Sequence, residues 1–153
     1  MTTADIVTAK GTFTVEFYDK ETPITVKNFL DLAKKGYYDG LTFHRVIPGF
    51  VIQGGCPNTR EGATGPVGAG GPGYTIPCET KAEKQYHDRG VLSMAHRGPN
   101  TGGSQFFVCL SRTQTQHLDR VHTCFGKVTN GIDIIDTIRG GDRIEKIVVH
   151  EQA

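Results

Sequence analysis

The chain has 153 residues, with 17 lysines and arginines against 16 acidic residues and a net charge of +1. This balance gives no reason to expect binding to nucleic acid or to an acidic membrane surface. The sequence begins without the basic start and apolar core of a signal peptide, and no run approaches the roughly 18 apolar residues of a membrane span. Length and composition therefore predict one domain over residues 1–153, and we expect a cytoplasmic monomer.

The first forty residues predict a β-hairpin followed by an amphipathic helix. Every second residue of the segment TFTVEFY (12–18) is apolar or aromatic, and a Lys-Gly turn separates it from an apolar pair at 6–7. A period of two is typical of a strand. Thr22 stands before Pro23, a common helix start, and apolar residues then recur at helical spacing until Gly36. One face of this helix should be buried.

From residue 41 onward the apolar runs are short and bounded by Gly, Pro, Asn or Asp, which indicates strands. These runs are LTFHRVI (41–47), FVIQ (50–53), VLSMA (91–95), SQFFVCL (104–110), CFGKV (124–128) and IEKIVVH (144–150). A second helix fits GIDIIDTIRGG (131–141), where isoleucines recur every three residues. About eight strands with two separate helices favour a mainly β fold, a closed eight-stranded antiparallel barrel capped by the two α-helices. The irregular stretch 57–73 is expected to be a surface loop.

Arg45 and Gln53 are the unexpected residues of FHRVIPGFVIQGG (43–55), a stretch that otherwise looks buried. Both numbers are odd, so the two side chains share one face if the Pro48-Gly49 bend preserves the strand register. A guanidinium keeps its proton at ordinary pH and acts by donating hydrogen bonds, not as an acid or base. Two interpretations stay open at this point: a cation beside an apolar surface, or a structural arginine paired with a buried carboxylate.

The cysteines and histidines give no complete metal or redox motif. Cys56 and Cys78 bracket the glycine-rich loop, so free thiols and a pairing of these two, by a disulfide or a shared metal, both stay open. His117 and His122 with Cys124 have the spacing of half a zinc site, but no second pair of ligands stands elsewhere in the sequence. The serines lack the Gly-x-Ser-x-Gly setting of a nucleophile. We therefore expect no metal, no cofactor and no covalent catalysis.

Three blocks of the sequence resemble the cyclophilins, a family of peptidyl-prolyl cis-trans isomerases. They are FHRVIPGFVIQGG (43–55), GVLSMAHRGPNTGGSQFFVCL (90–110) and HLDRVHTCFGKV (117–128). The first hairpin, the first helix and the last helix also follow in the family's order, so the resemblance covers nearly the whole chain. It implies a closed eight-stranded barrel with a helix over each end. It also implies catalysed rotation about the bond before proline in peptides and in unfolded or folding proteins.

The same resemblance assigns roles to individual residues. Arg45 matches the catalytic arginine, and the matches to the substrate-binding residues are Phe50, Val51, Gln53, Ala95, His96, Gln105, Phe107, His117, Leu118 and His122. Three of these differ from the best-known eukaryotic members. Val51 replaces a methionine, His96 an asparagine that binds substrate largely through its backbone, and His117 a tryptophan that donates a hydrogen bond to cyclosporin. We expect the backbone contact at His96 to persist and cyclosporin to bind weakly.

A physical argument gives Arg45 a part in such a reaction. The bond before proline resists rotation by about 18–20 kcal/mol because the amide nitrogen shares its lone pair with the carbonyl, and twisting localises that pair. A donor aimed at the nitrogen then binds the twisted state more strongly than the planar one. The alternative function is a non-catalytic module that holds a proline-containing segment in the same pocket. A barrel that binds nucleic acid has little support, since no basic stripe with interleaved aromatic residues is present.

Overall fold

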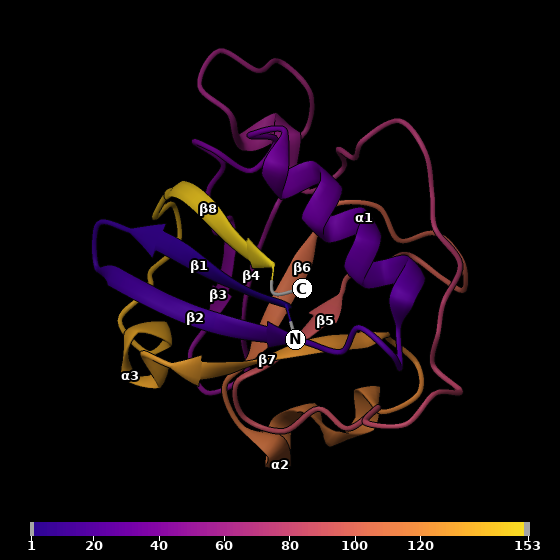
Figure 1. Cartoon of the computed structure of the whole chain (residues 1–153). Coiled ribbons are helices and arrows are strands. Elements are labelled where there is room, and N and C mark those ends of the chain that lie inside the picture. The colour runs from indigo at the N-terminus through magenta and orange to yellow at the C-terminus, as the bar shows by residue number, and fades with distance from the viewer. Residues whose placement is uncertain (1, 152–153) are drawn as a thin grey trace.

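The structure of the chain is a computed structural model in which residues 2–151 are described (Figure 1). Its strands are β1 (Thr2–Thr8), β2 (Gly11–Phe17), β3 (Arg45–Ile47), β4 (Val51–Gly54), β5 (Val91–Met94), β6 (Phe106–Cys109), β7 (Cys124–Asn130) and β8 (Ile144–Glu151). The α-helices are α1 (Pro23–Lys34), α2 (Arg112–Thr115) and α3 (Ile132–Ile135), and the 3₁₀ turns are η1 (Pro57–Thr59) and η2 (Gln116–Leu118). The mainly β class and the eight strands predicted from the sequence are confirmed.

The eight strands form one antiparallel sheet in the order β3-β4-β6-β5-β7-β2-β1-β8. The sheet curls on itself, but its edge strands β3 and β8 do not pair directly within the described chain. An isolated bridge between Thr42 and Arg143 joins the two edges, and next to it the Ile144 N–H donates to the Leu41 carbonyl at 2.7 Å. The closed barrel predicted from the sequence is therefore an overstatement. The molecule is a half-barrel completed by this short contact.

Helix α1 begins where the sequence predicts, but its N-terminus is capped from a distant loop. Thr22 occupies the N-cap position, yet its hydroxyl donates to the Tyr18 carbonyl and makes no capping bond. The Glu79 carboxylate instead accepts the backbone N–H of Thr25 at 2.7 Å and that of Ile24 at 3.3 Å. A carboxylate in this place also faces the positive end of the helix dipole.

Both predicted helices are present, as α1 and α3, and residues 2–151 contain a third α-helix, α2, that the sequence did not predict. Helix α3 covers four residues, and the remainder of segment 131–141 is turn or irregular, although Ile135 and Ile138 are buried as their spacing suggested. Helix α2 also has four residues. Its sequence RTQT has no apolar periodicity that would mark it as a helix.

Aromatic rings fill the space between the sheet and α1. The ring of Phe29 lies 4.9 Å from that of Tyr38, 5.3 Å from those of Phe106 and Phe125, and 5.5 Å from that of Phe17, measured between centroids. Burying each such side chain contributes about 1.5–3 kcal/mol relative to leaving it exposed. This cluster fixes α1 over the concave side of the sheet, as Figure 1 shows.

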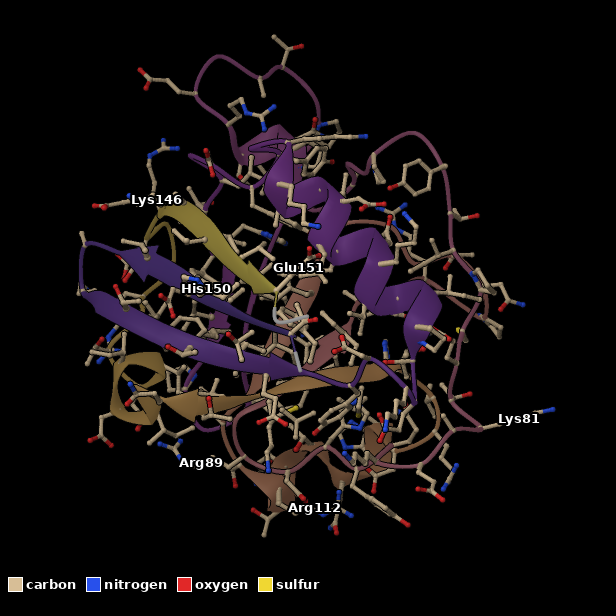
Figure 2. The ribbon with its side chains drawn as sticks, in the orientation of Figure 1. Lys81, Arg89, Arg112, Lys146, His150 and Glu151 are labelled. Atoms are coloured by element: carbon tan, nitrogen blue, oxygen red, sulfur yellow. The ribbon has the colours of Figure 1, made fainter. Side chains whose placement is uncertain are left out.

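The buried and exposed residues of β8 show which face of the sheet is inside. Ile144 and Ile147 are buried, whereas Lys146 and His150 are exposed and extend outward from the strand (Figure 2).

No helix among residues 2–151 is long and apolar enough to cross a membrane.

The segment 57–73 is a largely exposed surface loop, as predicted, with the short turn η1 at its start. It leaves the barrel through Gly55, whose φ of +91° favours glycine. A Cβ at this position would lie 2.6 Å from the Ser104 carbonyl oxygen. The close approach of these two backbones therefore explains the second glycine of the motif QGG.

All four cysteines are free thiols, so Cys56 and Cys78 are not paired. The buried Cys56 sulfur accepts the backbone N–H of Gly68 and that of Gly70, each at 3.3 Å. The Cys78 sulfur accepts the Asn100 N–H, also at 3.3 Å. Both thiols hold loops in place by accepting hydrogen bonds.

Candidate functional site

The β3–β4 hairpin sets Arg45 opposite Gln53. The turn between the strands is closed by the Phe50 N–H, which donates to the Ile47 carbonyl at 2.9 Å, and Gly49 has the positive φ of +76° that a type II turn needs at its third position. The ladder pairs Arg45 with Gln53, and Arg45 Nη1 donates to Gln53 Oε1 at 3.2 Å. The shared face predicted from the odd numbering is confirmed.

The guanidinium of Arg45 has donors to spare. Arg45 is exposed, and it forms no ion pair with any carboxylate in the described part of the chain. The bond to Gln53 is the one hydrogen bond that the Arg45 side chain makes among residues 2–151. The alternative of a structural arginine paired with a buried carboxylate therefore does not fit the structure. The bond to Gln53 orients the side chain while leaving other N–H groups free.

Beside Arg45 the sheet and η2 enclose a pocket of about 330 Å³. Its lining residues are Arg45, Phe50, Val51, Gln53, Ala95, His96, Phe107, Leu118 and His122, all of which the sequence predicts as site residues. Phe107 and Val51 are 4% and 2% exposed, so they form the apolar floor, while Phe50 and Leu118 are partly exposed at the walls. A pocket of this kind accepts a compact apolar ring.

Two stacked imidazoles form one side of the pocket. The rings of His96 and His122 lie 4.0 Å apart between centroids and are tilted by 16°. His122 Nδ1 is 2.9 Å from the Met94 carbonyl, an acceptor, so Nδ1 carries the proton and Nε2 is left as an acceptor in the neutral ring. Burial lowers the pKa of His122, and the nearby His96 and His117 lower it further against the opposing bond to Met94. The pocket histidine is therefore neutral near pH 7.

The His96 ring is fixed at both nitrogens. Its Nδ1 accepts the Gly98 N–H at 3.1 Å, so Nε2 carries the proton and donates to the Val121 carbonyl at 2.8 Å. The backbone N–H and carbonyl of His96 have no hydrogen-bond partner among residues 2–151. These groups are thus available at the pocket edge, which is the contact expected to survive the change from asparagine.

Two predicted residues do not line this pocket. His117 lies outside it, exposed, with its ring stacked on that of Phe50 at 6.1 Å. Gln105 lies at the boundary with a second, adjoining pocket, where its side-chain N donates to the carbonyls of Gly68 and Gly70, each at 2.9 Å. The Gln105 donors are therefore committed to holding the loop.

The adjoining pocket, of about 600 Å³, was not predicted from the sequence. It shares Arg45, Gln53, Ala95 and His96 with the first pocket. Its other lining residues come from the loop 67–72 and the segment 101–105, together with His44, Tyr74, Thr75 and Arg97. The loop 57–73 carried no sequence signal for this role, because its position depends on bonds to Cys56 and Gln105. An extended chain could thus occupy both pockets at once.

The fixed charges of the site are all positive. Among the described residues no aspartate or glutamate lines either pocket, whereas Arg45 lines both and Arg97 lines the larger one. The site therefore offers hydrogen-bond donors and an apolar floor, but no carboxylate base beside them. It can stabilise developing electron density on a bound ligand, whereas general acid–base chemistry by a carboxylate has no group here to perform it.

Comparisons with known proteins agree with this geometry. Residues 3–152 match the family model described as cyclophilin type peptidyl-prolyl cis-trans isomerase/CLD. The chain is 49% identical over 151 residues to a peptidyl-prolyl cis-trans isomerase of Synechococcus elongatus, an alignment that covers 97% of each protein. It is 52% identical over 134 residues to peptidyl-prolyl cis-trans isomerase B of Bacillus subtilis, which covers 88% of this chain and 87% of that protein.

Solved structures show the same likeness. A crystal structure of a Cryptosporidium parvum cyclophilin type peptidyl-prolyl cis-trans isomerase superimposes with a TM-score of 0.85 and 33% sequence identity, covering 99% of this chain and 98% of the other. A crystal structure of the same Cryptosporidium parvum protein in the presence of the dipeptide Ala-Pro gives a TM-score of 0.84 at 33% identity and covers 98% of this chain and 99% of the other.

Proposed function

The chain belongs to the family of cyclophilin-type peptidyl-prolyl cis-trans isomerases, and from this premise we propose that the pocket beside Arg45 is its active site. The proline ring of the substrate lies on Phe107 and Val51, and Arg45 acts on the bond before that proline. The observation that carries the assignment is an exposed guanidinium at the rim of an apolar pocket: within residues 2–151 it pairs with no carboxylate, and no other arginine, lysine, aspartate or glutamate lines that pocket. The enzyme class predicted from the sequence follows from the family.

Arg45 lowers the barrier by binding the twisted bond more strongly than the planar one. In the planar amide the nitrogen lone pair is delocalised into the carbonyl, whereas in the twisted state it is an acceptor. An N–H of Arg45 donates to that acceptor, and Gln53 holds the guanidinium in place by its bond at 3.2 Å. The interaction is made fully in the transition state, as catalysis requires.

One charge-assisted hydrogen bond contributes about 1.5–3 kcal/mol, which corresponds to about one to two powers of ten in rate. The remainder of the acceleration comes from holding one end of the rotating bond. Phe50, Phe107 and Leu118 fix the proline ring, and the free backbone groups of His96 bind the preceding residue. The Ala-Pro dipeptide named with the Cryptosporidium parvum relative supports a proline-containing ligand for this pocket.

We further propose that the substrates are proline-containing peptides and unfolded or folding proteins, and that the enzyme acts as a cytoplasmic monomer without metal or cofactor. Uncatalysed isomerisation takes about 10–100 s at 25 °C, slow enough to limit folding. The adjoining pocket gives room for residues that precede the proline. The side chains lining that second pocket therefore select among flanking sequences.

The test is the relaxation of a proline tetrapeptide from cis to trans, followed with wild-type protein and with Arg45→Ala. We expect wild type to accelerate relaxation and Arg45→Ala to lose about 10- to 100-fold of that activity, because one charge-assisted bond is removed. Arg139→Ala is the matched control: it deletes an exposed arginine on the loop after α3, away from both pockets. Near-normal activity of Arg45→Ala would refute the role of Arg45. A folded wild type that binds the peptide without acceleration would identify a binding module instead.

A further inference from the structure

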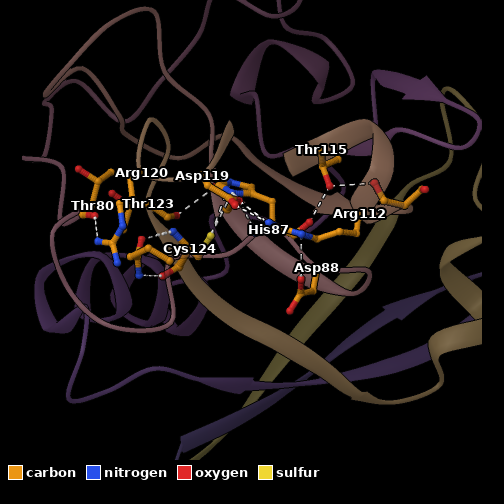
Figure 3. Close-up of polar contacts among 12 residues, drawn as sticks. Thr80, His87, Asp88, Arg112, Thr115, Asp119, Arg120, Thr123 and Cys124 are labelled. Carbon is orange, nitrogen blue, oxygen red and sulfur yellow. Dashed lines mark hydrogen bonds and ion pairs between the residues drawn. The ribbon is translucent and has the colours of Figure 1, made fainter. Parts of the chain in front are cut away.

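A fully buried histidine lies directly behind the pocket floor. His87 precedes β5 in the chain and is 0% exposed. Its Nδ1 is 3.1 Å from Asp119 Oδ1, and its Nε2 is 2.7 Å from Ser93 Oγ. Figure 3 shows His87 within this network, in which the Asp119 carboxylate links the imidazole to Arg112. The Thr115 hydroxyl donates to the His87 carbonyl at 2.6 Å.

The contacts and the burial of the ring together determine its protonation. A carboxylate only accepts, so Nδ1 of His87 donates to Asp119. In the neutral ring Nε2 is then an acceptor, and it takes the Ser93 hydroxyl proton at 2.7 Å in competition with the Thr123 carbonyl, which lies 3.2 Å from the same oxygen. Burial lowers the pKa of His87 to about 4 against the raising effect of Asp119, which keeps the ring neutral at pH 7. The order Ser93, His87, Asp119 has the connectivity of a hydrolase triad. Ser93 is 0% exposed, however, so no substrate reaches its oxygen and the network has no nucleophilic role.

One face of the His87 ring supports the pocket floor. The rings of His87 and Phe107 are stacked, with centroids 5.9 Å apart and planes 16° apart. Phe107 in turn meets His122 edge to face at 5.5 Å. On the sulfur side, Cys124 Sγ lies 3.4 Å from His87 Nδ1. The imidazole is therefore packed between Phe107 and the buried thiol, and the orientation of its plane fixes how far Phe107 can tilt.

His87 also holds in place the pocket wall that contains Leu118. Asp119 directly follows Leu118, and besides the ring it accepts the His87 backbone N–H at 2.7 Å. The Arg112 guanidinium donates two hydrogen bonds to the same carboxylate, at 3.0 and 2.7 Å. Because Phe107 belongs to β6 and Leu118 to η2, the pocket floor and one of its walls, from different elements, are joined through one imidazole.

We propose that His87 is a positioning residue for the proline pocket, which sets the separation of Phe107 and Leu118 without touching the substrate. The proposal rests on the function proposed above, since it assigns the proline to that pocket. A ring held this way acts on binding of the proline equally in the ground state and in the transition state. Loss of the residue should then raise the substrate Kd and KM while leaving kcat nearly unchanged.

The experiment measures the Kd of a proline tetrapeptide by NMR titration and, in parallel, KM and kcat for its isomerisation. We expect His87→Leu, which removes the ring and both of its bonds, to raise Kd and KM about ten-fold with kcat within about two-fold of wild type. His87→Phe restores a ring face for Phe107 without the bonds to Asp119 and Ser93, and should recover part of the affinity. If His87→Leu does not fold, His87→Phe is the variant whose Kd and KM are compared with those of wild type.

Two further measurements separate positioning from general stability. Ile135→Val trims a fully buried side chain in α3, outside both pockets, and should lower stability without changing Kd. The imidazole ¹⁵N signals of His87 should report a neutral ring protonated at Nδ1 and should shift when peptide is added. The proposal would be overturned if Kd were unchanged in both His87 variants, or if the ¹⁵N chemical shifts of His87 did not change at saturating peptide. A wild type that binds peptide but does not catalyse would instead refute the isomerase assignment, and the Kd comparison would still decide the role of His87.

Discussion

His117 is exposed outside the pocket, with its ring stacked on that of Phe50, which lines the pocket. The family resemblance places at this position a tryptophan whose indole N–H donates to cyclosporin. An imidazole on Phe50 is smaller and carries its N–H closer to the backbone. The structure therefore gives a physical basis for expecting weak binding of the drug, because the donor does not reach as far.

We predict weak inhibition of the wild type by cyclosporin and a clear gain in the variant His117→Trp, measured as inhibition of tetrapeptide isomerisation. His150→Trp is the matched control, because it places the same side chain at an exposed histidine on β8, outside both pockets. Nanomolar inhibition of the wild type would contradict this prediction. Equal gains in both tryptophan variants would show a nonspecific effect.

At the same scale, individual residues differ in how far the sequence reveals them. The period-two alternation put Arg45 and Gln53 on one face, and the ladder shows this pairing. The family motif named every residue that lines the smaller pocket. The motif did not reveal that the donors of Gln105 are committed to the carbonyls of Gly68 and Gly70. This contact depends on the path of an irregular loop, for which no periodicity exists.

Among the elements, α1 depends on a cap that no local pattern indicates. Thr22 and Pro23 mark the start of the helix in the sequence, but the side chain that caps it is Glu79, more than fifty residues away. The long segment between η1 and β5 is therefore fastened to the helix. The Glu79 carboxylate accepts hydrogen bonds from backbone N–H groups of the first turn that have no partner within the helix.

We predict that Glu79→Ala lowers the free energy of unfolding by about 0.5–2 kcal/mol, the usual effect of losing a helix cap, with kcat/KM for the tetrapeptide unchanged. Urea denaturation followed by circular dichroism measures the first quantity. Glu83→Ala is the control, because it removes an exposed carboxylate from the same segment. Equal stability of the two variants would show that the contact seen at α1 contributes nothing.

For the molecule as a whole, the sequence predicts the individual strands better than it predicts how the two edges of the sheet meet. Eight strands follow from short alternating runs between turn residues, because each run is a local signal. The contact between the two edges of the sheet, at Thr42 and Arg143, joins segments about a hundred residues apart and leaves no local trace. Helix α2 was missed for a related reason: four residues without an apolar face contain too little pattern to recognise.

The buried histidine makes the stability of the whole molecule depend on pH. Burial lowers the pKa of His87 to about 4, whereas a histidine in the unfolded chain has its ordinary pKa of about 6.5, so between these values the unfolded state binds more protons than the folded one. Stability is therefore complete above pH 6.5 and falls as the pH decreases toward 4. The shift corresponds to a free energy of about 3–4 kcal/mol at most, since one pKa unit is about 1.4 kcal/mol. The lowered pKa of His122 acts in the same direction.

Asp119 adds a second loss at lower pH. Burial raises its pKa, but the bonds from Arg112 and His87 outweigh this and bring the pKa to about 2. The stability that this carboxylate provides is then lost only as the pH falls from about 4 toward 2. The contribution of the buried histidine can thus be observed between pH 4.5 and 6.5, before the carboxylate titrates.

We predict that the urea midpoint of the wild type decreases from pH 7 to pH 4.5 and that His87→Phe shows a smaller decrease, because phenylalanine cannot be protonated. The comparison of the two slopes isolates His87 from His122 and from the other titrating groups, which both proteins share. Parallel curves would mean that His87 binds its proton as readily in the folded state as in the unfolded one. In that case the ring would not be the neutral link between Phe107 and Asp119 that the geometry describes.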